Sequence, residues 1–475
     1  MSSPLWTKDE IVAATGARIG GFTHATGASI DTRTLEPGDL YFAIKGDVHD
    51  GHDFVPAALE KGASAAVVSE EKAASFSSDK LIVVPDVLDA MRRMGEAARR
   101  RTNARIVAIT GSVGKTGTKE AMRLALSRQG ATHASVASYN NHWGVPLTLA
   151  RMPRETEYGV FEIGMNHAYE ILPLTGMVRP HVAVITTIEP VHIEFFPSLW
   201  GIADAKGEIF SSVEPGGTAL INRDSPYFER MKAHAFASAA GRVVSFGEHE
   251  TADIRAERIL VRPDQSIVEA TVFGQPLTYK IGTAGRHIAL NSLSVLAAAH
   301  ALGADLALVA LSFTELKPPV GRGERTLLSV GDGETLLIDE SYNANPASMR
   351  AALSNLGAVE LERNARRIAV LGDMKELGDK GPGLHEGLVE AIEANAIDLL
   401  FAAGPLTQSL VDKLPKAKVA LHAETSAELV DAVCAAVRPG DAVMVKGSLS
   451  MKMALIVKAL KERYGAGQVA HALKG

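Results

Sequence analysis

Short apolar runs, separated by turn residues, recur along the first hundred residues of the chain. The pattern predicts strands at 39–44, 63–68 and 81–84. A helix is predicted over 86–101, and its basic C-terminal end suits the helix dipole. We therefore predict a first α/β domain that comprises residues 1–102.

In the middle of the chain, buried strands alternate with helical segments. Residues 106–110 form a continuous apolar run rich in β-branched residues, which is typical of a parallel strand buried on both faces. A glycine loop and a helix that extends to Gln129 follow this run. Further strands are predicted at 158–163, 182–186 and 218–221. This alternation favours right-handed βαβ units, so we predict a doubly wound domain over residues 103–316.

The segment 317–323 is the clearest linker in the chain. Its sequence, K-P-P-V-G-R-G, contains two prolines and two glycines and can continue neither a helix nor a strand. A new alternation of strands and helices follows, with strands predicted at 335–338, 367–371, 399–403 and 442–445. We therefore predict a third, Rossmann-like α/β domain over residues 317–475.

The composition fits this picture and excludes several classes of protein. The 475 residues suit three domains of roughly 150 residues each. The net charge is −6, from 49 Lys and Arg against 55 Asp and Glu, and this disfavours nucleic acid as a partner. Cys434 is the only cysteine, which excludes an internal disulfide or a cysteine-based metal cluster and fits a reducing cytoplasm. No apolar run reaches about 18 residues, so we expect no membrane span, and the first residues do not resemble a secretory signal.

The strongest chemical motif is a glycine turn between the strand at 106–110 and the following helix. It comprises Gly111, Ser112, Val113, Gly114, Lys115 and Thr116. Such a turn directs successive backbone N–H groups at phosphate oxygens. Lys115 can neutralise the β- and γ-phosphates, and the Thr116 hydroxyl can ligate Mg²⁺. Ile109 stands where the general phosphate-loop pattern has its first glycine, and the alternative interpretation is a helix-capping turn with a chance lysine.

The shortened motif T-G-x-x-G-K-T resembles the Mur ligase family, the ATP-dependent amide ligases of peptidoglycan precursor synthesis, and the related folylpolyglutamate synthetases. A second similar segment, F-E-I-G-M-N-H, places Glu162 at a predicted strand end, where a carboxylate can hold Mg²⁺ on the phosphates. A third combines His192 with Lys206, fourteen residues later. The resemblance implies that His192 ligates a second Mg²⁺ and that Lys206 is carbamylated.

The implied carbamate is chemically reasonable. A lysine beside Mg²⁺ is disfavoured as an ammonium, so its pKa should fall and the neutral amine can add CO₂. For each residue taken alone, the alternative is structural. Glu162 would then be a solvated strand end, His192 a structural histidine and Lys206 a surface charge.

The resemblance also implies further contacts with ATP. Asn291, in the segment A-G-R-H-I-A-L-N, corresponds to an asparagine that approaches the adenine, with helix capping as the alternative. An arginine and an aspartate reach ATP from beyond the linker. Arg322 and Arg325 compete for the first role, and we favour Arg325 with Asp339 because of their spacing. Two residues are expected to flank the adenine and ribose: Tyr342 and Asn343.

Other segments imply contacts with the substrates. The segments S-I-D-T-R and D-G-H resemble the family's UDP-binding domain, which folylpolyglutamate synthetases lack, and N-N resembles a substrate-side loop. The residues implied are Ser29, Asp31, Arg33, Asp50, Gly51, His52, Asn140 and Asn141. Turns are the alternative interpretation of S-x-D-x-R and N-N. Strand-end residues of the last domain suit a zwitterionic amino-acid substrate: Asp373, Lys446 and Ser448.

The segment S-Y-N-A-N-P at 341–346 discriminates best within the family. It resembles the branch that joins D-alanyl-D-alanine to a UDP-N-acetylmuramoyl tripeptide through an acyl phosphate. The tetrapeptide D-N-P-R, which often marks the diaminopimelate- or lysine-adding branch, does not occur. Two alternatives stay open, a ligase of that second branch and a non-catalytic scaffold that binds nucleotide and UDP-linked precursors.

Taken together, the resemblance predicts an ATP-dependent amide ligase with three α/β domains: a UDP-substrate-binding domain, a central P-loop ATPase-like domain and a C-terminal amino-acid-binding domain. Its cofactors would be ATP, two Mg²⁺ ions and carbamylated Lys206. The implied catalytic residues are Lys115, Glu162, His192 and Lys206, and the implied metal ligands are Thr116, Glu162, His192 and Lys206. We expect a cytoplasmic monomer, although sequence alone defines neither the oligomeric state nor the third residue of the peptide.

Overall fold

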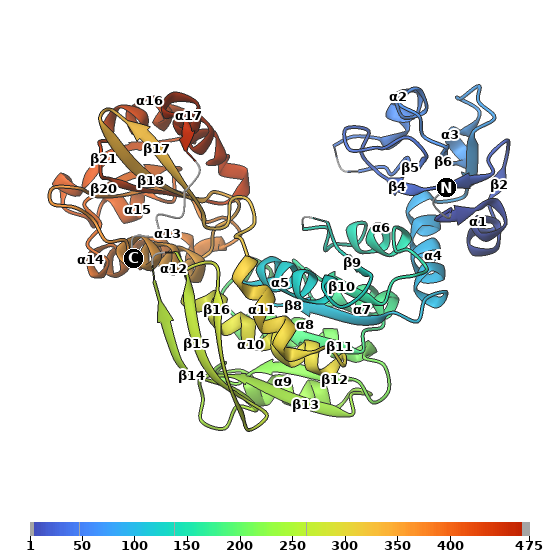
Figure 1. The fold of residues 1–475 in the computed structure, drawn as a ribbon. Coiled ribbons are helices and arrows are strands. Elements are labelled where there is room, and N and C mark those ends of the chain that lie inside the picture. Colours follow the sequence, from blue (N-terminus) through green and yellow to red (C-terminus); the bar gives the residue numbers. More distant parts are fainter. Residues whose placement is uncertain (1–3, 47, 137, 263, 468–475) are drawn as a thin grey trace.

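The computed structural model of the chain describes residues 4–46, 48–136, 138–262 and 264–467. Its strands form three large sheets that follow one another along the sequence, and helices flank each sheet (Figure 1). The predicted α/β class and the succession of three α/β domains are therefore confirmed. In the described part of the chain, no helix has both the length and the apolar character needed to cross a membrane.

The N-terminal sheet has the strand order β2-β7-β6-β5-β4, and every pair is parallel except β2–β7. Its strands are β2 (Arg18–Ile19), β4 (Gly27–Ser29), β5 (Asp39–Phe42), β6 (Ala65–Ser69) and β7 (Leu81–Val84). A separate antiparallel pair is formed by β1 (Trp6–Thr7) and β3 (His24–Ala25). The three apolar runs predicted as strands become β5, β6 and β7 because their side chains fill the core on both faces of this sheet.

The helices of this domain are α1 (Lys8–Thr15), α2 (Val55–Glu60), α3 (Glu70–Ala73) and α4 (Val87–Arg100). The predicted helix at 86–101 is α4, and Asp86 caps it by accepting a hydrogen bond from the Asp89 N–H (2.6 Å). At its other end, buried Arg99 donates through Nε to the Val178 carbonyl (2.7 Å) and through a terminal nitrogen to the Arg179 carbonyl (2.8 Å). Arg99 thus ties the N-terminal domain to the central one.

The central sheet has the order β16-β15-β14-β13-β12-β11-β8-β10-β9. Its parallel part comprises β8 (Arg105–Thr110), β9 (Thr132–Ala134), β10 (Tyr158–Glu162), β11 (Val182–Ile185), β12 (Thr218–Asn222) and β13 (Arg242–Gly247). The sheet continues into an antiparallel ribbon of β14 (Ile254–Val261), β15 (Ser266–Val272) and β16 (Gln275–Ile281). The strands β8, β10, β11 and β12 were predicted from the sequence, whereas β9, β13 and the ribbon were not.

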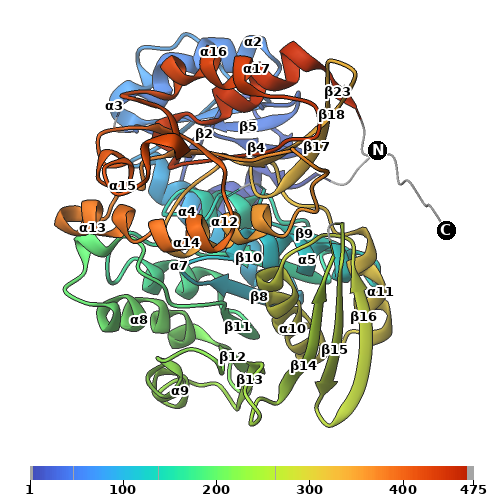
Figure 2. The same cartoon turned by 90° about the vertical axis from the view of Figure 1, so that its left-hand side faces the viewer.

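Helices cover both faces of the central sheet, as a doubly wound fold requires. One face packs against α5 (Lys115–Ser127), α10 (Arg286–Ala301) and α11 (Leu306–Ser312). The other packs against α6 (Gly144–Ala150), α7 (Ile171–Val178), α8 (Leu199–Gly207) and α9 (Phe228–Phe236), with the short turns η2 (Ile193–Phe195) and η3 (Glu208–Ser212) between them. Figures 1 and 2 both show the antiparallel ribbon at one edge of this domain, beside α10.

The C-terminal sheet has the order β21-β20-β19-β22-β18-β17-β23, with antiparallel pairs only at the β18–β17–β23 edge. Its strands are β17 (Glu324–Val330), β18 (Gly333–Glu340), β19 (Arg367–Gly372), β20 (Leu399–Ala403), β21 (Val419–Ala423), β22 (Ala442–Lys446) and β23 (Ala466–Gly467). Its helices are α12 (Pro346–Gly357), α13 (Gly381–Glu386), α14 (Val389–Ala394), α15 (Gln408–Val411), α16 (Ser426–Ala436) and α17 (Ala454–Tyr464).

The N-terminal and C-terminal domains lie on the same side of the central domain, at its opposite ends (Figure 1). Helix α6 joins the first two domains, because Leu147 and Ala150 pack into the N-terminal core and the Trp6 indole donates to the Ala150 carbonyl (2.8 Å). The predicted linker at 317–323 contains neither helix nor strand. The exact domain boundaries near residues 102 and 316 stay predictions.

Candidate active site

The predicted phosphate loop connects β8 to α5 at the carboxyl edge of the central sheet. Gly111 and Gly114 adopt φ of +145° and +87°, which favour glycine over residues with a side chain. A Cβ at Gly111 would lie 1.9 Å from Thr186 Oγ1, so a side chain cannot fit there. Lys115 is the first residue of α5, and its Nζ donates to the Gly111 carbonyl (2.7 Å). The loop therefore presents an amine and the N-terminus of a helix, which together suit an anion.

The segment after β11 holds this loop in shape. Ser112 donates its hydroxyl to the Glu189 carbonyl (3.0 Å) and accepts from the Glu189 N–H (2.8 Å). Thr186 donates its hydroxyl to the Val113 carbonyl (2.6 Å). Sequence reasoning did not assign Thr186 or Glu189 a role. Their only signal was a polar run directly after a buried strand, at the edge where such folds bind ligands.

Glu162 occupies the end of β10 and pairs in register with Ile109 of β8, two residues before the phosphate loop. Its side chain is 1% exposed. Oε1 accepts a hydrogen bond from Asn140 Nδ2 (2.8 Å), whereas Oε2 is buried and has no hydrogen-bond partner. Removal from solvent lowers the pKa of Lys115, and the negative charge of Glu162 acts against that shift. The carboxylate and the loop amine therefore belong to one electrostatic site.

Lys206 lies on α8 and is as deeply buried as Glu162. Its amine has no hydrogen-bond or ion-pair partner among the described residues. Burial lowers the pKa of Lys206 well below its ordinary value, and the positive charge of Lys115 lowers it further. This environment favours the neutral amine.

His192 lies directly before η2 with a φ of +54°, a conformation that is uncommon for a residue with a side chain. Its Nδ1 is 2.5 Å from Oε2 of Glu376 in the C-terminal domain, an ion-pair distance, and Nδ1 has no other polar partner among the described residues. The interaction with His192 lowers the pKa of Glu376. Glu376 was missed by sequence reasoning, because this contact exists only where two domains meet.

The donor atoms fit Mg²⁺ bound on a nucleotide. Oε2 of Glu162 is a buried carboxylate oxygen without a partner, and such oxygen atoms are the ligands that Mg²⁺ prefers. Thr116 is the second residue of α5, directly after Lys115, and its hydroxyl lies 3.5 Å from the Ser138 hydroxyl. The described residues contain no group of three or more His, Cys, Asp and Glu that could hold a metal by themselves. A metal here would need the phosphates as additional ligands.

The nucleotide residues predicted from the central domain lie against the loop. A Cβ at Gly114 would lie 2.4 Å from Asn291 Nδ2, which places this amide of α10 directly beside the phosphate loop. His287, one helical turn earlier in α10, lines a pocket together with three residues from beyond the linker: Arg322, Arg325 and Glu340. The central and C-terminal domains thus share this pocket.

The structure places the two competing arginines in different surroundings. The positive charge of Arg322 acts on Lys115, and its guanidinium lies 4.1 Å from the centre of the Tyr342 ring. Arg325, which the spacing favoured, is withdrawn from solvent, and this lowers its pKa against the opposing charges of Asp264 and Glu340. The charge of Arg322 thus acts on the lysine of the phosphate loop, and which of the two arginines contacts ATP stays a prediction.

The remaining nucleotide candidates lie at the end of β18. Asp339 accepts two hydrogen bonds at Oδ1, from the Ser341 N–H (3.0 Å) and the Ser341 hydroxyl (2.6 Å). The Asn343 carbonyl accepts from Lys446 Nζ (3.0 Å), which also lies 3.2 Å from Glu340 Oε2. These bonds fix the turn that carries Tyr342, and they satisfy the Lys446 ammonium within the protein.

Asp373 and Ser448 lie next to each other at the carboxyl ends of β19 and β22. Both form hydrogen bonds within the protein. The buried Asp373 carboxylate accepts from the Thr407 N–H (2.9 Å) and pairs with Lys375 Nζ (2.8 Å). The Asp373 carbonyl accepts from the Ser448 N–H (3.0 Å), and the Ser448 hydroxyl accepts from the Lys375 N–H (2.9 Å). Their predicted contact with an amino-acid substrate stays a prediction.

The candidates of the N-terminal domain form two local turns. Asp31 holds Arg33 in a bidentate ion pair (2.6–3.1 Å), and the Ser29 hydroxyl donates to the Asp31 carbonyl (3.0 Å). His52 Nε2 accepts from the Ser69 N–H (3.1 Å), so Nδ1 carries the proton and donates it to Asp50 (2.6 Å). Gly51 accepts from the Tyr41 hydroxyl (3.0 Å). Their role in binding UDP stays a prediction.

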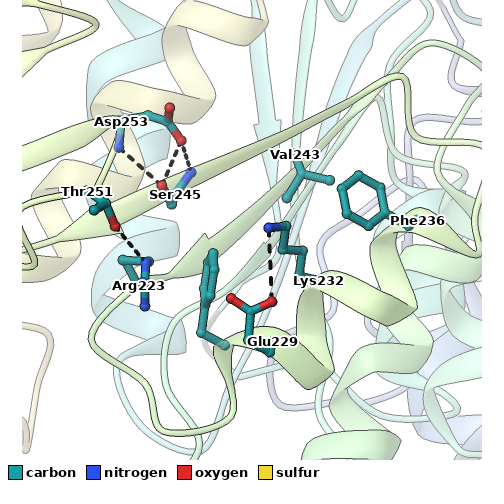
Figure 3. A pocket seen from close by; sticks show the side chains of 9 residues that line it. Arg223, Glu229, Lys232, Phe236, Val243, Ser245, Thr251 and Asp253 are labelled. Atoms are coloured by element: carbon teal, nitrogen blue, oxygen red, sulfur yellow. Dashed lines mark hydrogen bonds and ion pairs between the residues drawn. The ribbon is translucent and has the colours of Figure 1, made fainter.

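A second pocket lies apart from all these residues, between α9, β13 and the loops that follow β12 and precede β14 (Figure 3). It encloses about 330 Å³. Arg223 donates to Thr251 (3.0 Å) and Ser245 donates its hydroxyl to Asp253 (2.6 Å), so its polar groups are largely paired with each other. No residue predicted to bind nucleotide, metal or substrate lines this pocket.

The phosphate loop, the buried carboxylate beside it and the pocket shared with the last domain define a P-loop nucleotide-binding enzyme. Three family models match the chain: the Mur ligase family catalytic domain over residues 24–107, the Mur ligase middle domain over 109–299 and the Mur ligase glutamate ligase domain over 321–449. The chain belongs to the Mur ligase family and is an ATP-dependent ligase.

Proteins similar to this chain match it over nearly its whole length. A UDP-N-acetylmuramoyl-tripeptide–D-alanyl-D-alanine ligase of Rickettsia prowazekii is 30% identical, over 95% of this chain and 99% of that protein. The enzyme of that name from Bacillus subtilis is 31% identical, over 92% and 93%. A crystal structure of MurF from Acinetobacter baumannii superimposes with a TM-score of 0.84 at 28% identity, covering 97% of this chain and 99% of that one.

Proposed function

We propose that this ligase joins D-alanyl-D-alanine to UDP-N-acetylmuramoyl-tripeptide at the expense of ATP, in the synthesis of peptidoglycan precursors. The observation that carries the proposal is the near-complete coverage of relatives that bear this name, across all three domains. The segment at 341–346 supports it independently, because it distinguishes this branch from other members of the family.

The proposed reaction has two steps. An oxygen of the terminal carboxylate of the tripeptide attacks the γ-phosphorus of ATP, and ADP leaves. The amine of D-alanyl-D-alanine then attacks the carbonyl carbon of the acyl phosphate, and phosphate leaves with one oxygen of the former carboxylate. Lys115 stabilises the charge that develops on the transferred phosphoryl group, and Arg322 approaches the same charge from the C-terminal domain.

Thr116 and Glu162 would hold Mg²⁺ on the nucleotide, and the free Oε2 of Glu162 supports this assignment. Bound Mg²⁺ would neutralise phosphate charge. His192 and carbamylated Lys206 would serve a second ion. The carbamate is supported by the burial of Lys206, the lack of a hydrogen-bond or ion-pair partner within the described residues, and the lowered pKa, since only the neutral amine adds CO₂.

The proposed partners are the two small substrates. A cytoplasmic location suits ATP as co-substrate and the single, buried, free Cys434. We expect the enzyme to act as a monomer, and the pocket at Arg322 is lined by two domains of the same chain.

Phosphate release should depend on the correct pair of substrates. With ATP and UDP-N-acetylmuramoyl-tripeptide, D-alanyl-D-alanine should start steady release of phosphate, whereas diaminopimelate, lysine and single D-alanine should not. The measurement is a coupled phosphate assay, with the UDP-muramoyl dipeptide as a control acceptor. Turnover only with the dipeptide plus diaminopimelate or lysine would instead assign the other branch. Nucleotide binding without turnover in any combination would indicate a scaffold.

A further inference from the structure

The two neighbouring asparagines of the loop between β9 and α6 have different structural roles. Asn141 stabilises the turn that leads into α6, because its Oδ1 accepts the Gly144 N–H (2.9 Å). Asn140 points the other way, and its Nδ2 donates to Glu162 Oε1 (2.8 Å). The resemblance assigned both residues to the substrate, but Asn140 is engaged with the carboxylate proposed to hold Mg²⁺.

Asn140 is itself held firmly. Its carbonyl accepts the Gly164 N–H (2.8 Å), and its own N–H donates to the Ser138 carbonyl (2.8 Å). A Cβ at Gly164 would lie 2.9–3.1 Å from the atoms of the Asn140 amide group, so the glycine leaves just enough room for that amide. The segment that follows β10 therefore fixes Asn140 from one side while Glu162 engages it from the other.

The hydrogen bond from Asn140 makes the two carboxylate oxygens of Glu162 inequivalent. Oε1 is occupied by the amide, and Oε2 is buried without a partner. An unrestrained carboxylate could rotate about its last bond and exchange the two oxygens. The amide N–H selects a single orientation, and groups that orient a metal ligand in this way commonly determine metal affinity.

We propose that Asn140 is a positioning residue that orients Glu162 so that Oε2 faces the nucleotide-bound Mg²⁺. Its contribution is then to metal affinity, and contact with the UDP-linked substrate is secondary. The proposal rests on the metal site of the proposed function. Its test needs only metal and nucleotide, so it stands apart from the identity of the amino-acid substrate.

The test is the binding of Mn²⁺ to the full-length protein in the presence of ADP, followed by the electron paramagnetic resonance of free Mn²⁺. Asn140→Ala should raise the apparent Kd for Mn²⁺ by about 10- to 100-fold. Asn140→Leu keeps the volume of the side chain without its donor and should give the same result. Asn103→Ala is the matched control, because it removes an exposed asparagine that lies before β8, and it should leave the Kd for Mn²⁺ unchanged.

Gly164→Ala tests the same hydrogen bond by a substitution at the residue that packs against the Asn140 amide. Its new Cβ displaces the Asn140 amide without deleting it, so Mn²⁺ affinity should fall in this variant too. Thermal unfolding of each variant shows whether it is folded. Unchanged Mn²⁺ affinity in folded Asn140→Leu, together with a raised KM for the UDP-linked substrate, would overturn the proposal and return Asn140 to a substrate contact.

Discussion

Replacing Lys115 with alanine should leave the fold intact and lower kcat by roughly 10³-fold or more. Lys115 Nζ lies over the carbonyls of the phosphate loop, 2.7 Å from Gly111 and 3.4 Å from Ser112, where a γ-phosphate can replace these weak partners. The positive charge is worth most when charge spreads over the transferred phosphoryl group. Steady-state phosphate release with saturating substrates measures the effect.

Two comparisons make the Lys115 experiment decisive. Thermal unfolding of Lys115→Ala separates loss of chemistry from loss of structure. Lys458→Ala removes an exposed lysine of α17, far along the sequence from the phosphate loop, and should keep normal kcat. Near-normal kcat in folded Lys115→Ala would remove the assignment of the phosphate loop.

The second large effect is expected at Lys206. Both Lys206→Ala and Lys206→Arg should lose activity, on the order of 10²- to 10³-fold in kcat, if the site needs an anion at that point. Arginine retains a fixed positive charge and cannot take up CO₂. It should therefore perform no better than alanine, even though it preserves the charge of an ammonium. The measurement is kcat for both variants at saturating Mg²⁺.

Chemical rescue separates a carbamate from a simple cation. A small carboxylate such as acetate should partly restore Lys206→Ala, because it supplies the missing anion beside the metal. Raised bicarbonate should help only the wild-type enzyme, since the alanine variant has no amine to carbamylate. High activity of Lys206→Arg would contradict the carbamate, because a cation paired with phosphate would then be sufficient.

Local sequence patterns predicted much of the fold. The apolar run before Gly111 and the helix after it identify the nucleotide loop, because motif and secondary structure lie within about twenty residues of each other. Glu162 could be placed because parallel strands end at one edge of a sheet, and β10 indeed pairs directly with β8. The three-domain order followed from alternating strands and helices and from a Pro- and Gly-rich linker.

Features that depend on tertiary contacts could not be predicted. The ribbon β14–β16 was not predicted, although buried positions recur at every second residue along much of β15, a pattern typical of antiparallel strands. Spacing favoured Arg325, which lies inside β17 opposite Ile338, whereas Arg322 lies in the preceding turn and its positive charge acts on Lys115. The contact of His192 with Glu376 depends on how two domains meet.

The most direct test of the central claim follows the oxygen atoms of the peptide substrate. UDP-N-acetylmuramoyl-tripeptide labelled with ¹⁸O in its terminal carboxyl group is incubated with ATP, Mg²⁺ and D-alanyl-D-alanine, and the released phosphate is analysed by mass spectrometry. An acyl-phosphate intermediate predicts a single ¹⁸O in each phosphate and the other in the new amide. Unlabelled phosphate would show that water, and not the carboxylate, attacks ATP, and would contradict the proposed ligase reaction.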